Sequence, residues 1–250
     1  MTDRFTSFAA LHTPGEPLIL FNAWDPGSAQ AVAKAGAKAI ATGSASVAMA
    51  HGAGDGEALP LEAAIANAAR IVAAVDLPVT IDFEGGYATE SDAVAANLAL
   101  LAATGVVGCN FEDQVIGGAG LLSPEVQAAR IGAIRRGLGG AFFINARTDI
   151  FLKAPAAEHD EAKVDAALER ARAYADAGAS GLFVPGLLDL KLIERVTREA
   201  PLPVNIMWTP NAPATAALAE AGVARISHGP FPYMAAMARL EEAARAALGG

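Results

Sequence analysis

The sequence predicts a single (β/α)8 barrel, that is, an α/β fold of TIM-barrel type, over residues 1–250. Three observations lead to this prediction. The length of 250 residues is the usual size of one such domain. Eight short apolar runs alternate with helical segments, as strands buried on both faces of a parallel sheet do. No glycine-rich dinucleotide fingerprint follows the first run, which disfavours an open doubly wound sheet.

Recurring glycine and proline positions mark where the predicted strands begin. Four of them follow a glycine that ends a helix, at positions 36, 105, 178 and 222. Two others follow a Leu-Pro pair, at 77–78 and 202–203, where proline opens a strand without losing an interior hydrogen bond. In order, the predicted strands cover residues 18–21, 38–42, 79–83, 106–112, 141–146, 180–185, 204–208 and 224–227.

Helical segments separate these strands. They are predicted at residues 27–35, 61–75, 90–103, 124–136, 161–177, 189–199, 212–221 and 231–247. Residues 43–56 and 115–123 are rich in glycine and are predicted to be loops, as is the segment 153–160. These loops follow strands two, four and five, on the face where barrel enzymes carry their chemistry.

Composition restricts the function. Eighteen Lys and Arg residues against 27 Asp and Glu give a formal net charge of -9, which disfavours nucleic acids and anionic membranes as partners. A small-molecule substrate is expected instead. The N-terminus lacks a secretory signal, and no apolar run approaches the length of a membrane span. The one cysteine, Cys109, is predicted to be a buried thiol, so a cytoplasmic location is expected.

Acidic residues gather near the predicted strand ends, at Asp55, Asp82, Glu84 and Glu112. Buried carboxylates are costly unless a cation or hydrogen bonds compensate them. Residues two apart on a strand point to the same side, so Asp82 and Glu84 can reach one ion. The pattern predicts a site for Mg²⁺, with Mn²⁺ also possible. Helix capping or pairing with arginine is the structural alternative.

Three further polar residues, Tyr87, Arg147 and Asn205, lie on or shortly after predicted strands. The guanidinium of Arg147 suits a substrate carboxylate or phosphonate. Asn205 could hold a second carboxylate or be a buried amide bonded to loops. Tyr87 could donate to a developing enolate or pack under a lid. His51 and His228 are the histidines expected near this face, and His228 is a candidate acid-base group or a loop histidine bonded to backbone.

Several motifs recur in the order and spacing of one superfamily. They are Asn22-Ala23-Trp24-Asp25, Thr42-Gly43-Ser44, Asp55, Asp82-Phe83-Glu84-Gly85-Gly86-Tyr87, Glu112-Asp113-Gln114, Arg147-Thr148-Asp149 and Asn205. Through them the chain resembles the isocitrate lyase/phosphoenolpyruvate mutase superfamily over nearly its whole length. The resemblance implies a Mg²⁺-dependent enzyme that acts on small α-oxo acids and stabilises an enolpyruvate-type oxyanion. It also implies a homo-oligomer, a dimer or tetramer, in which subunits exchange the last helix, residues 231–247.

The resemblance assigns roles to individual residues. Asp82 is expected to bind the ion directly, and Asp55, Glu84 and Glu112 largely through waters. The expected substrate-binding residues are Trp24, Thr42, Gly43, Ser44, Arg147 and Asn205. The expected catalytic residues are Asp55, Tyr87, Glu112 and Arg147.

The chain also departs from the superfamily. Its isocitrate and methylisocitrate lyases carry Lys-x-Cys-Gly-His on a lid after strand four, whereas residues 115–122 here contain no titratable side chain. The asparagine or threonine and lysines of the phosphonate enzymes are missing there too. The glutamate that the lyases carry on strand six is replaced by the Val184-Pro185-Gly186 stretch. A lid-borne general acid is therefore excluded, although the lid could still exclude water.

The expected function is carbon-carbon cleavage or decarboxylation of a small α-oxo or hydroxy di- or tricarboxylic acid. Decarboxylation of a β-oxo acid needs an electron sink but no lid acid. The chief alternative uses the same site to transfer or hydrolyse a phosphorus-carbon bond. A third hypothesis, of another class, is a protein that binds an oxo acid with Mg²⁺ and does not turn it over.

Overall fold

The computed structural model, which describes residues 4–249, confirms the barrel. Eight parallel strands form one sheet in the order β1-β8-β7-β6-β5-β4-β3-β2. Between β1 and β2 the described residues form no regular ladder, and a bridge from Ala23 to Thr42 joins the barrel there. The strands are β1 (Leu18–Leu20), β2 (Ile40–Ala41), β3 (Val79–Asp82), β4 (Gly108–Glu112), β5 (Phe143–Arg147), β6 (Gly181–Phe183), β7 (Val204–Met207) and β8 (Arg225–Ser227). All eight predicted strands are present.

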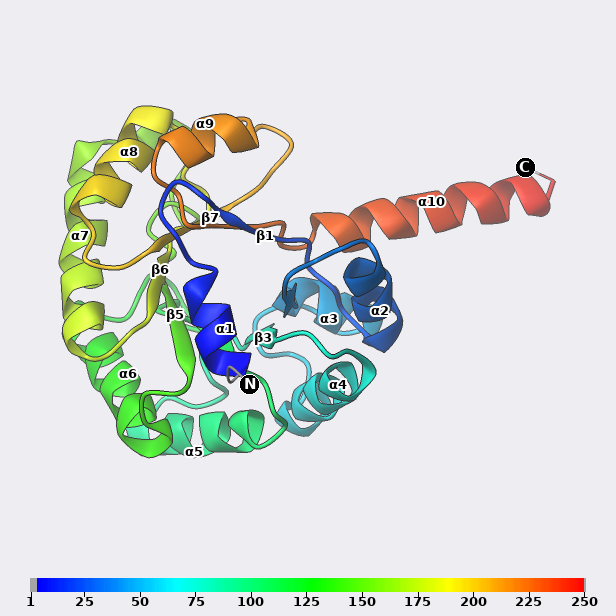
Figure 1. Ribbon diagram of the computed structural model, residues 1–250, viewed down its shortest axis with the longest axis horizontal. Helices are drawn as coiled ribbons and strands as arrows, with labels where there is room; N and C mark the ends of the chain where they lie inside the picture. Colours follow the sequence, from blue (N-terminus) through cyan, green and yellow to red (C-terminus); the bar gives the residue numbers. More distant parts are fainter. Residues whose placement is uncertain (1–3, 250) are drawn as a thin grey trace.

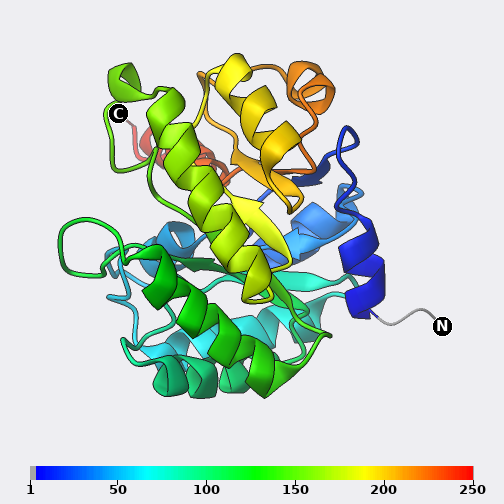
Figure 2. The same ribbon diagram turned by 90° about the vertical axis from the view of Figure 1, so that its left-hand side faces the viewer.

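Helices surround the sheet (Figure 1), and a quarter turn of the view brings α6, α7 and α8 in front of the strands (Figure 2). The predicted helices are all present as α2 (Pro26–Lys34), α4 (Leu61–Ala74), α5 (Ser91–Ala102), α6 (Pro124–Leu138), α7 (Glu161–Asp176), α8 (Leu190–Glu199), α9 (Thr215–Glu220) and α10 (Phe231–Ala247). Capping side chains begin several of them, for example Asp25 at α2, Ser123 at α6 and Asp160 at α7.

Three segments differ from the sequence prediction. The expected loop 43–56 contains helix α3 (Ser44–Ala50), because Ser-Ala-Ser-Val-Ala-Met-Ala holds no glycine and favours a helix. The loop 153–160 contains a short 3-10 helix, Ala156–Glu158. An additional helix, α1 (Arg4–Ala10), buries Phe8 against Leu18, Leu20 and Phe143. It covers the end of the barrel opposite the carboxyl ends of the strands.

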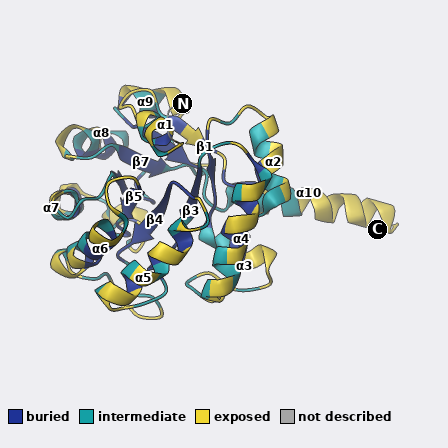
Figure 3. Ribbon diagram, turned by 60° about the horizontal axis from the view of Figure 1, so that its bottom comes forward, coloured by how far each residue is buried: buried dark blue, intermediate teal, exposed yellow. Residues whose placement is uncertain are grey.

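The core lies between the sheet and the helices, and the strands are its most buried part (Figure 3). Cys109, in the middle of β4, is a buried free thiol as predicted. No helix within residues 4–249 is long and apolar enough to cross a membrane. Helix α10 leaves the barrel and is exposed along most of its length (Figures 1 and 3).

Candidate active site

A cavity of about 180 Å³ opens at the carboxyl ends of the strands. Every strand, or the loop directly after it, contributes to its lining. In chain order these contributions are Asn22, Gly43, Asp82, Asn110, Arg147, Phe183, Met207 and Ser227. Ser44 and Asp55, from helix α3 and the loop after it, also line the cavity. Residues as far apart in the chain as Asn22 and Pro230 therefore surround one small volume, where a barrel fold places its chemistry.

Asp82, the last residue of β3, has one carboxylate oxygen without a partner. Its Oδ2 accepts hydrogen bonds from the Ser44 backbone N–H at 3.2 Å and from the Ser44 hydroxyl at 3.1 Å. Its backbone N–H donates to Oγ1 of Thr42 at 3.1 Å. The other oxygen, Oδ1, is buried and receives no hydrogen bond from the described residues. A buried carboxylate oxygen in this state is costly, and a bound cation would compensate it.

Two further acidic residues lie close to Asp82. Glu84 has a left-handed backbone, with φ of 50°, and its Oε2 accepts the backbone N–H of Glu57 at 2.7 Å. Burial, together with the carboxylates of Asp55 and Asp82, raises the pKa of Glu84 to about 8. Burial and the charge of Asp82 also raise the pKa of Asp55. The three carboxylates repel one another, and a divalent cation among them would relieve that repulsion.

The carboxylates fit a hydrated ion better than a closed cage of side chains. Among residues 4–249, no three His, Cys, Asp or Glu side chains come close enough together to hold a metal ion by themselves. Mg²⁺ commonly keeps several waters and is held by one or two carboxylates. The donor set of Asp82, with Asp55 and Glu84 behind it, suits such an ion.

Arg147, the last residue of β5, is held from two sides. Its Nε and Nη2 donate to the two carboxylate oxygens of Asp149, at 2.6 and 2.8 Å, and its Nη1 lies 2.8 Å from Oε2 of Glu112. Burial opposes the charged form, but Glu112 and Asp149 outweigh it and raise the pKa of Arg147. A guanidinium carries five N–H groups, so two remain for a ligand in the cavity.

Glu112, the last residue of β4, lies behind Arg147 and outside the cavity lining. It is buried, and its Oε1 accepts a hydrogen bond from Gln114 at 3.1 Å. Burial raises its pKa even though the neighbouring Arg147 favours the charged form. Its contacts hold Arg147 in position.

Six of the predicted site residues do not line the cavity: Trp24, Thr42, Glu84, Tyr87, Glu112 and Asn205. Trp24 packs edge-on against Tyr233 of α10, with ring centroids 5.2 Å apart. Tyr87 packs against Phe83, with ring centroids 5.1 Å apart, and lines a second cavity together with Glu57 and Arg130. Asn205 is buried and donates to Oγ of Ser227 at 3.1 Å. By contrast, Gly43 and Ser44 reach the cavity, and Thr42 supports Asp82 from behind.

His228 also lies outside the cavity lining. Its ring stacks on Trp208 at 4.9 Å and tilts against Phe21 at 5.2 Å. Burial lowers its pKa. Contact with two aromatic rings gives it a packing role at the end of β8.

The segment 115–122 forms a short hairpin. Gln114 and Leu121 make an antiparallel bridge, and the N–H of Val115 donates to the carbonyl oxygen of Gly120 at 3.2 Å. Ile116 packs closely over Gly85, because a Cβ atom at position 85 would lie 3.0 Å from Cγ1 of Ile116. The hairpin therefore covers the second cavity, beside Glu57 and Tyr87, with apolar side chains.

Sequence analysis did not assign five residues that the structure brings to this region: Asn22, Glu57, Asn110, Arg225 and Ser227. Asn22 connects two strand ends, because its Nδ2 donates to the carbonyl oxygen of Thr42 at 2.7 Å and its Oδ1 accepts the Gly229 N–H at 2.9 Å. Arg225 had a visible signal, since it is a charged residue inside an otherwise apolar predicted strand. Asn110 is likewise a polar residue inside a predicted strand, and the other three are ordinary polar residues near strand ends or in loops.

Comparison with known proteins agrees with this geometry. A family model described as phosphoenolpyruvate phosphomutase matches residues 8–248. The chain belongs to the phosphoenolpyruvate phosphomutase family. The predicted resemblance to the isocitrate lyase/phosphoenolpyruvate mutase superfamily is thereby confirmed, and with it the enzyme class in its broad sense of lyases and mutases.

Individual members of the superfamily carry names of different reactions. A crystal structure from Burkholderia cenocepacia J2315, provisionally named a phosphonomutase, is 50% identical with a TM-score of 0.94 and covers 99% of this chain and 98% of that one. An uncharacterised protein of Mycobacterium tuberculosis is 38% identical over 98% of this chain and 90% of its own. The 2-methylisocitrate lyase of Salmonella typhimurium is 30% identical, covering 78% and 70%. An oxaloacetate decarboxylase of Pseudomonas syringae is 28% identical, covering 94% and 81%.

Proposed function

We propose that this family member is a Mg²⁺-dependent lyase that cleaves a carbon-carbon bond in, or decarboxylates, a small α-oxo or hydroxy acid with two or three carboxylates. The observation that carries the proposal is that one cavity contains both a carboxylate oxygen able to bind a cation and a guanidinium able to bind an anion. Asp82 offers a buried oxygen that lacks a partner, and Arg147 offers two free N–H groups. The Arg147 Nη1 and Asp82 Oδ2 atoms are 3.9 Å apart.

The protein residues would divide the work as follows. Asp82 would hold Mg²⁺, with Asp55 and Glu84 supporting it through waters, and Mn²⁺ could take the same place. Glu112, expected from the sequence to support the ion as well, has both carboxylate oxygens engaged by Arg147 and Gln114 and would instead hold Arg147 in position. The chemistry that the bound ion supplies is stabilisation of negative charge on the oxo oxygen. Arg147 would bind a substrate carboxylate through its two remaining N–H groups and orient it. The apolar Leu152, Phe183 and Met207 would exclude water from the same volume.

The lid composition favours a reaction that needs no acid from the lid. Loss of carbon dioxide from a β-oxo acid breaks one carbon-carbon bond and leaves its electron pair on an enolate, which the site can stabilise. Residues 115–122 have no side chain that exchanges protons. The 2-methylisocitrate lyase and oxaloacetate decarboxylase relatives show that the superfamily includes both carbon-carbon reactions.

A second candidate is cleavage or transfer of a phosphorus-carbon bond. The family description and the provisional name of the 50% identical Burkholderia protein favour it. The same cavity would take a phosphonate, because a guanidinium binds phosphonate and carboxylate oxygens alike. The lid of this chain lacks the polar residues that the resemblance implies for those enzymes.

Incubation with Mg²⁺ and a panel of substrates separates these candidates. The panel is oxaloacetate, isocitrate, methylisocitrate and phosphonopyruvate, with chromatographic detection of the products. Release of pyruvate, glyoxylate or succinate from a di- or tricarboxylate is the expected result. Turnover of phosphonopyruvate alone would establish the second candidate. Binding of these acids without any product would indicate a non-catalytic oxo-acid binding protein.

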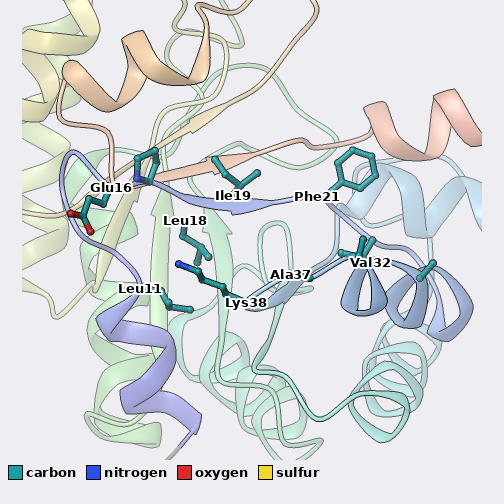
Figure 4. Close-up of a pocket in the computed structure, with 12 residues that line it drawn as sticks. Leu11, Glu16, Leu18, Ile19, Phe21, Val32, Ala37 and Lys38 are labelled. Atoms are coloured by element: carbon teal, nitrogen blue, oxygen red, sulfur yellow. The ribbon is translucent and has the colours of Figure 1, made fainter.

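We also propose that the protein is a homo-oligomer in which α10 packs on a second copy. Helix α10 projects away from its own barrel and exposes Met234 and Leu240, at 53% and 61%. On the barrel, β1 and the residue directly after it expose Ile19 and Phe21, at 40% and 49%. These two residues line an apolar groove of about 520 Å³ together with Val32 (Figure 4). A helix of a second copy would cover this groove and bury both apolar surfaces.

A cytoplasmic location is part of the proposal. Cys109 is a free thiol without a disulfide partner, as is usual in a reducing compartment.

A further inference from the structure

A polar network fills the interior of the barrel next to the cavity. Arg225, on β8, is 1% exposed. Its Nη2 donates to Oδ1 of Asn110 at 3.0 Å, and its Nε donates to Oγ of Ser227 at 3.1 Å. Asn145 donates to the same oxygen of Asn110 at 2.9 Å. Within the described residues, Arg225 forms no ion pair, although the more distant charge of Asp82 favours its charged form, and its Nη1 has no hydrogen-bond partner.

The network determines which way the Asn110 amide points. A guanidinium has N–H donors and no acceptor, so the atom of Asn110 that faces Arg225 must be the oxygen. That oxygen accepts two hydrogen bonds, which occupy both of its lone pairs. Asn110 also lines the cavity. Its amide nitrogen, which donates to no acceptor among the described residues, is therefore the group available to a ligand.

The position of Asn110 suits a substrate held by the proposed site. On β4 it is the register partner of Asp82 on β3 and of Asn145 on β5, and Arg147 comes two residues after Asn145 on the same side of the strand. Asn110 therefore lies between the side chain proposed to hold the cation and the strand that carries Arg147.

We propose that Asn110 is a substrate-binding residue whose Nδ2 donates a hydrogen bond to an anionic oxygen, a carboxylate or enolate oxygen of the oxo acid. Arg225 is the positioning residue that orients this amide and adds positive charge behind it. The inference rests on the proposed function, because it takes an oxo acid as the ligand. It explains why an arginine without a carboxylate partner is kept in the barrel interior.

Calorimetric titration with oxalate in the presence of Mg²⁺ tests the role of Asn110. Oxalate is a planar dianion that matches the carboxylate and oxyanion of an enolpyruvate, and its binding needs no turnover. Asn110→Ala should weaken oxalate binding on the order of 10- to 100-fold, the loss expected for one hydrogen bond to a charged group. Asn110→Asp should weaken it further, because it adds repulsion to the loss of the donor.

Thermal melting separates binding from folding. Asn110→Asp gives the buried Arg225 a carboxylate partner, so its melting temperature should equal or exceed that of the wild type despite the weaker binding. Ser180→Ala is the matched control, because it removes interior hydrogen bonds to Arg135 and Ile144 at the opposite end of the barrel. It should leave oxalate affinity within twofold of the wild type.

A double-mutant cycle tests whether Arg225 acts through Asn110. Arg225→Lys should weaken oxalate binding several-fold in the wild-type background and cause little further loss in the Asn110→Ala background. Equal losses in both backgrounds would overturn the positioning role. If Arg225→Lys does not fold, Arg225→Gln serves in its place.

The outcomes distinguish this inference from the proposed function. Failure of the wild-type protein to bind oxalate with Mg²⁺ would overturn the proposed oxo-acid site itself. Wild-type binding that Asn110→Ala leaves within twofold would overturn only the assignment of Asn110. A selective loss of affinity in the Asn110 variants supports both.

Discussion

The unpartnered oxygen of Asp82 determines what a substitution at this residue should do. Asp82→Ala should abolish Mg²⁺ binding and turnover, because it removes the proposed ligand. It should leave the melting temperature of the metal-free protein unchanged or higher, because it relieves repulsion from Asp55 and Glu84. Calorimetric Mg²⁺ titration and thermal melting measure the two effects. An unfolded variant, or one with normal turnover, would make Asp82 a structural residue.

Arg147 provides a second test at the level of single residues. Three of its N–H groups are engaged by Glu112 and Asp149, which leaves two in a fixed arrangement. Arg147→Lys should raise KM at least roughly 10-fold, because an ammonium cannot reproduce this planar fork. Arg170→Lys is the matched control. Arg170 pairs with the buried Asp113, with Nη1 2.9 Å from Oδ2, and neither residue lines the cavity. An unchanged KM for Arg147→Lys would leave Arg147 only its structural pair with Asp149.

At the level of elements, the hairpin 115–122 should act by shape alone. Replacement of Ile116, Leu121 and Leu122 by alanine should raise KM several-fold, because closure of the hairpin over a bound substrate would then lack its apolar side chains. The pH dependence of kcat should not move, because no side chain of the hairpin titrates. A pH-rate profile of the triple variant measures this. A displaced pKa would mean that the hairpin positions an ionising group elsewhere in the site.

The end of helix α1 should make stability depend on pH. His12 stacks on Phe143 at 4.2 Å, and burial together with the charge of Arg225 lowers its pKa from 6.5 to about 3. The unfolded chain therefore binds the proton more readily than the folded chain between these values. Stability contributed by neutral His12 is present above pH 6.5 and is lost as the pH falls towards 3, at up to about 1.4 kcal/mol per pH unit.

Urea unfolding at pH 7 and pH 5 measures this effect. The wild type should lose more stability over that interval than His12→Gln, which keeps a hydrogen-bond donor and an acceptor but does not titrate. Equal losses in both proteins would place the pH sensitivity elsewhere.

For the whole molecule, the uncovered face of β1 and the projecting helix α10 should meet between subunits. Leu240→Glu and Phe21→Glu should each shift the protein towards monomers, because each places a charge in the proposed apolar interface. Light scattering coupled to size-exclusion chromatography measures the change in mass. Arg239→Glu, on a largely exposed neighbouring position of α10, controls for altered charge. A wild-type protein that is monomeric at micromolar concentration would contradict the assembly.

Sequence patterns alone were sufficient for the barrel and for part of the site. Glycine caps and Leu-Pro pairs mark strand and helix boundaries by local backbone preference, so all eight strands could be predicted. Asp82 and Arg147 could be placed at the cavity because barrel strands bring their carboxyl ends to one face, and Asp55 because the loop that carries it follows strand two on that face. Helix α3 was missed because the scattered glycines of its flanks obscured seven residues that favour a helix.

The remainder was decided only by tertiary structure. Strand position predicts only the end of the barrel at which a residue lies. Contacts with neighbouring side chains decide where its side chain points, and these contacts hold Trp24, Tyr87 and Asn205 outside the cavity. The proposed roles of Asn110 and Arg225 depend on the hydrogen bond between them, which joins residues 115 positions apart in the chain. The sequence by itself determined the family, the parallel barrel and the acidic mouth, which depend on local periodicity and strand ends. The orientation of an amide beside a buried guanidinium depends on long-range contacts, which only the folded barrel creates.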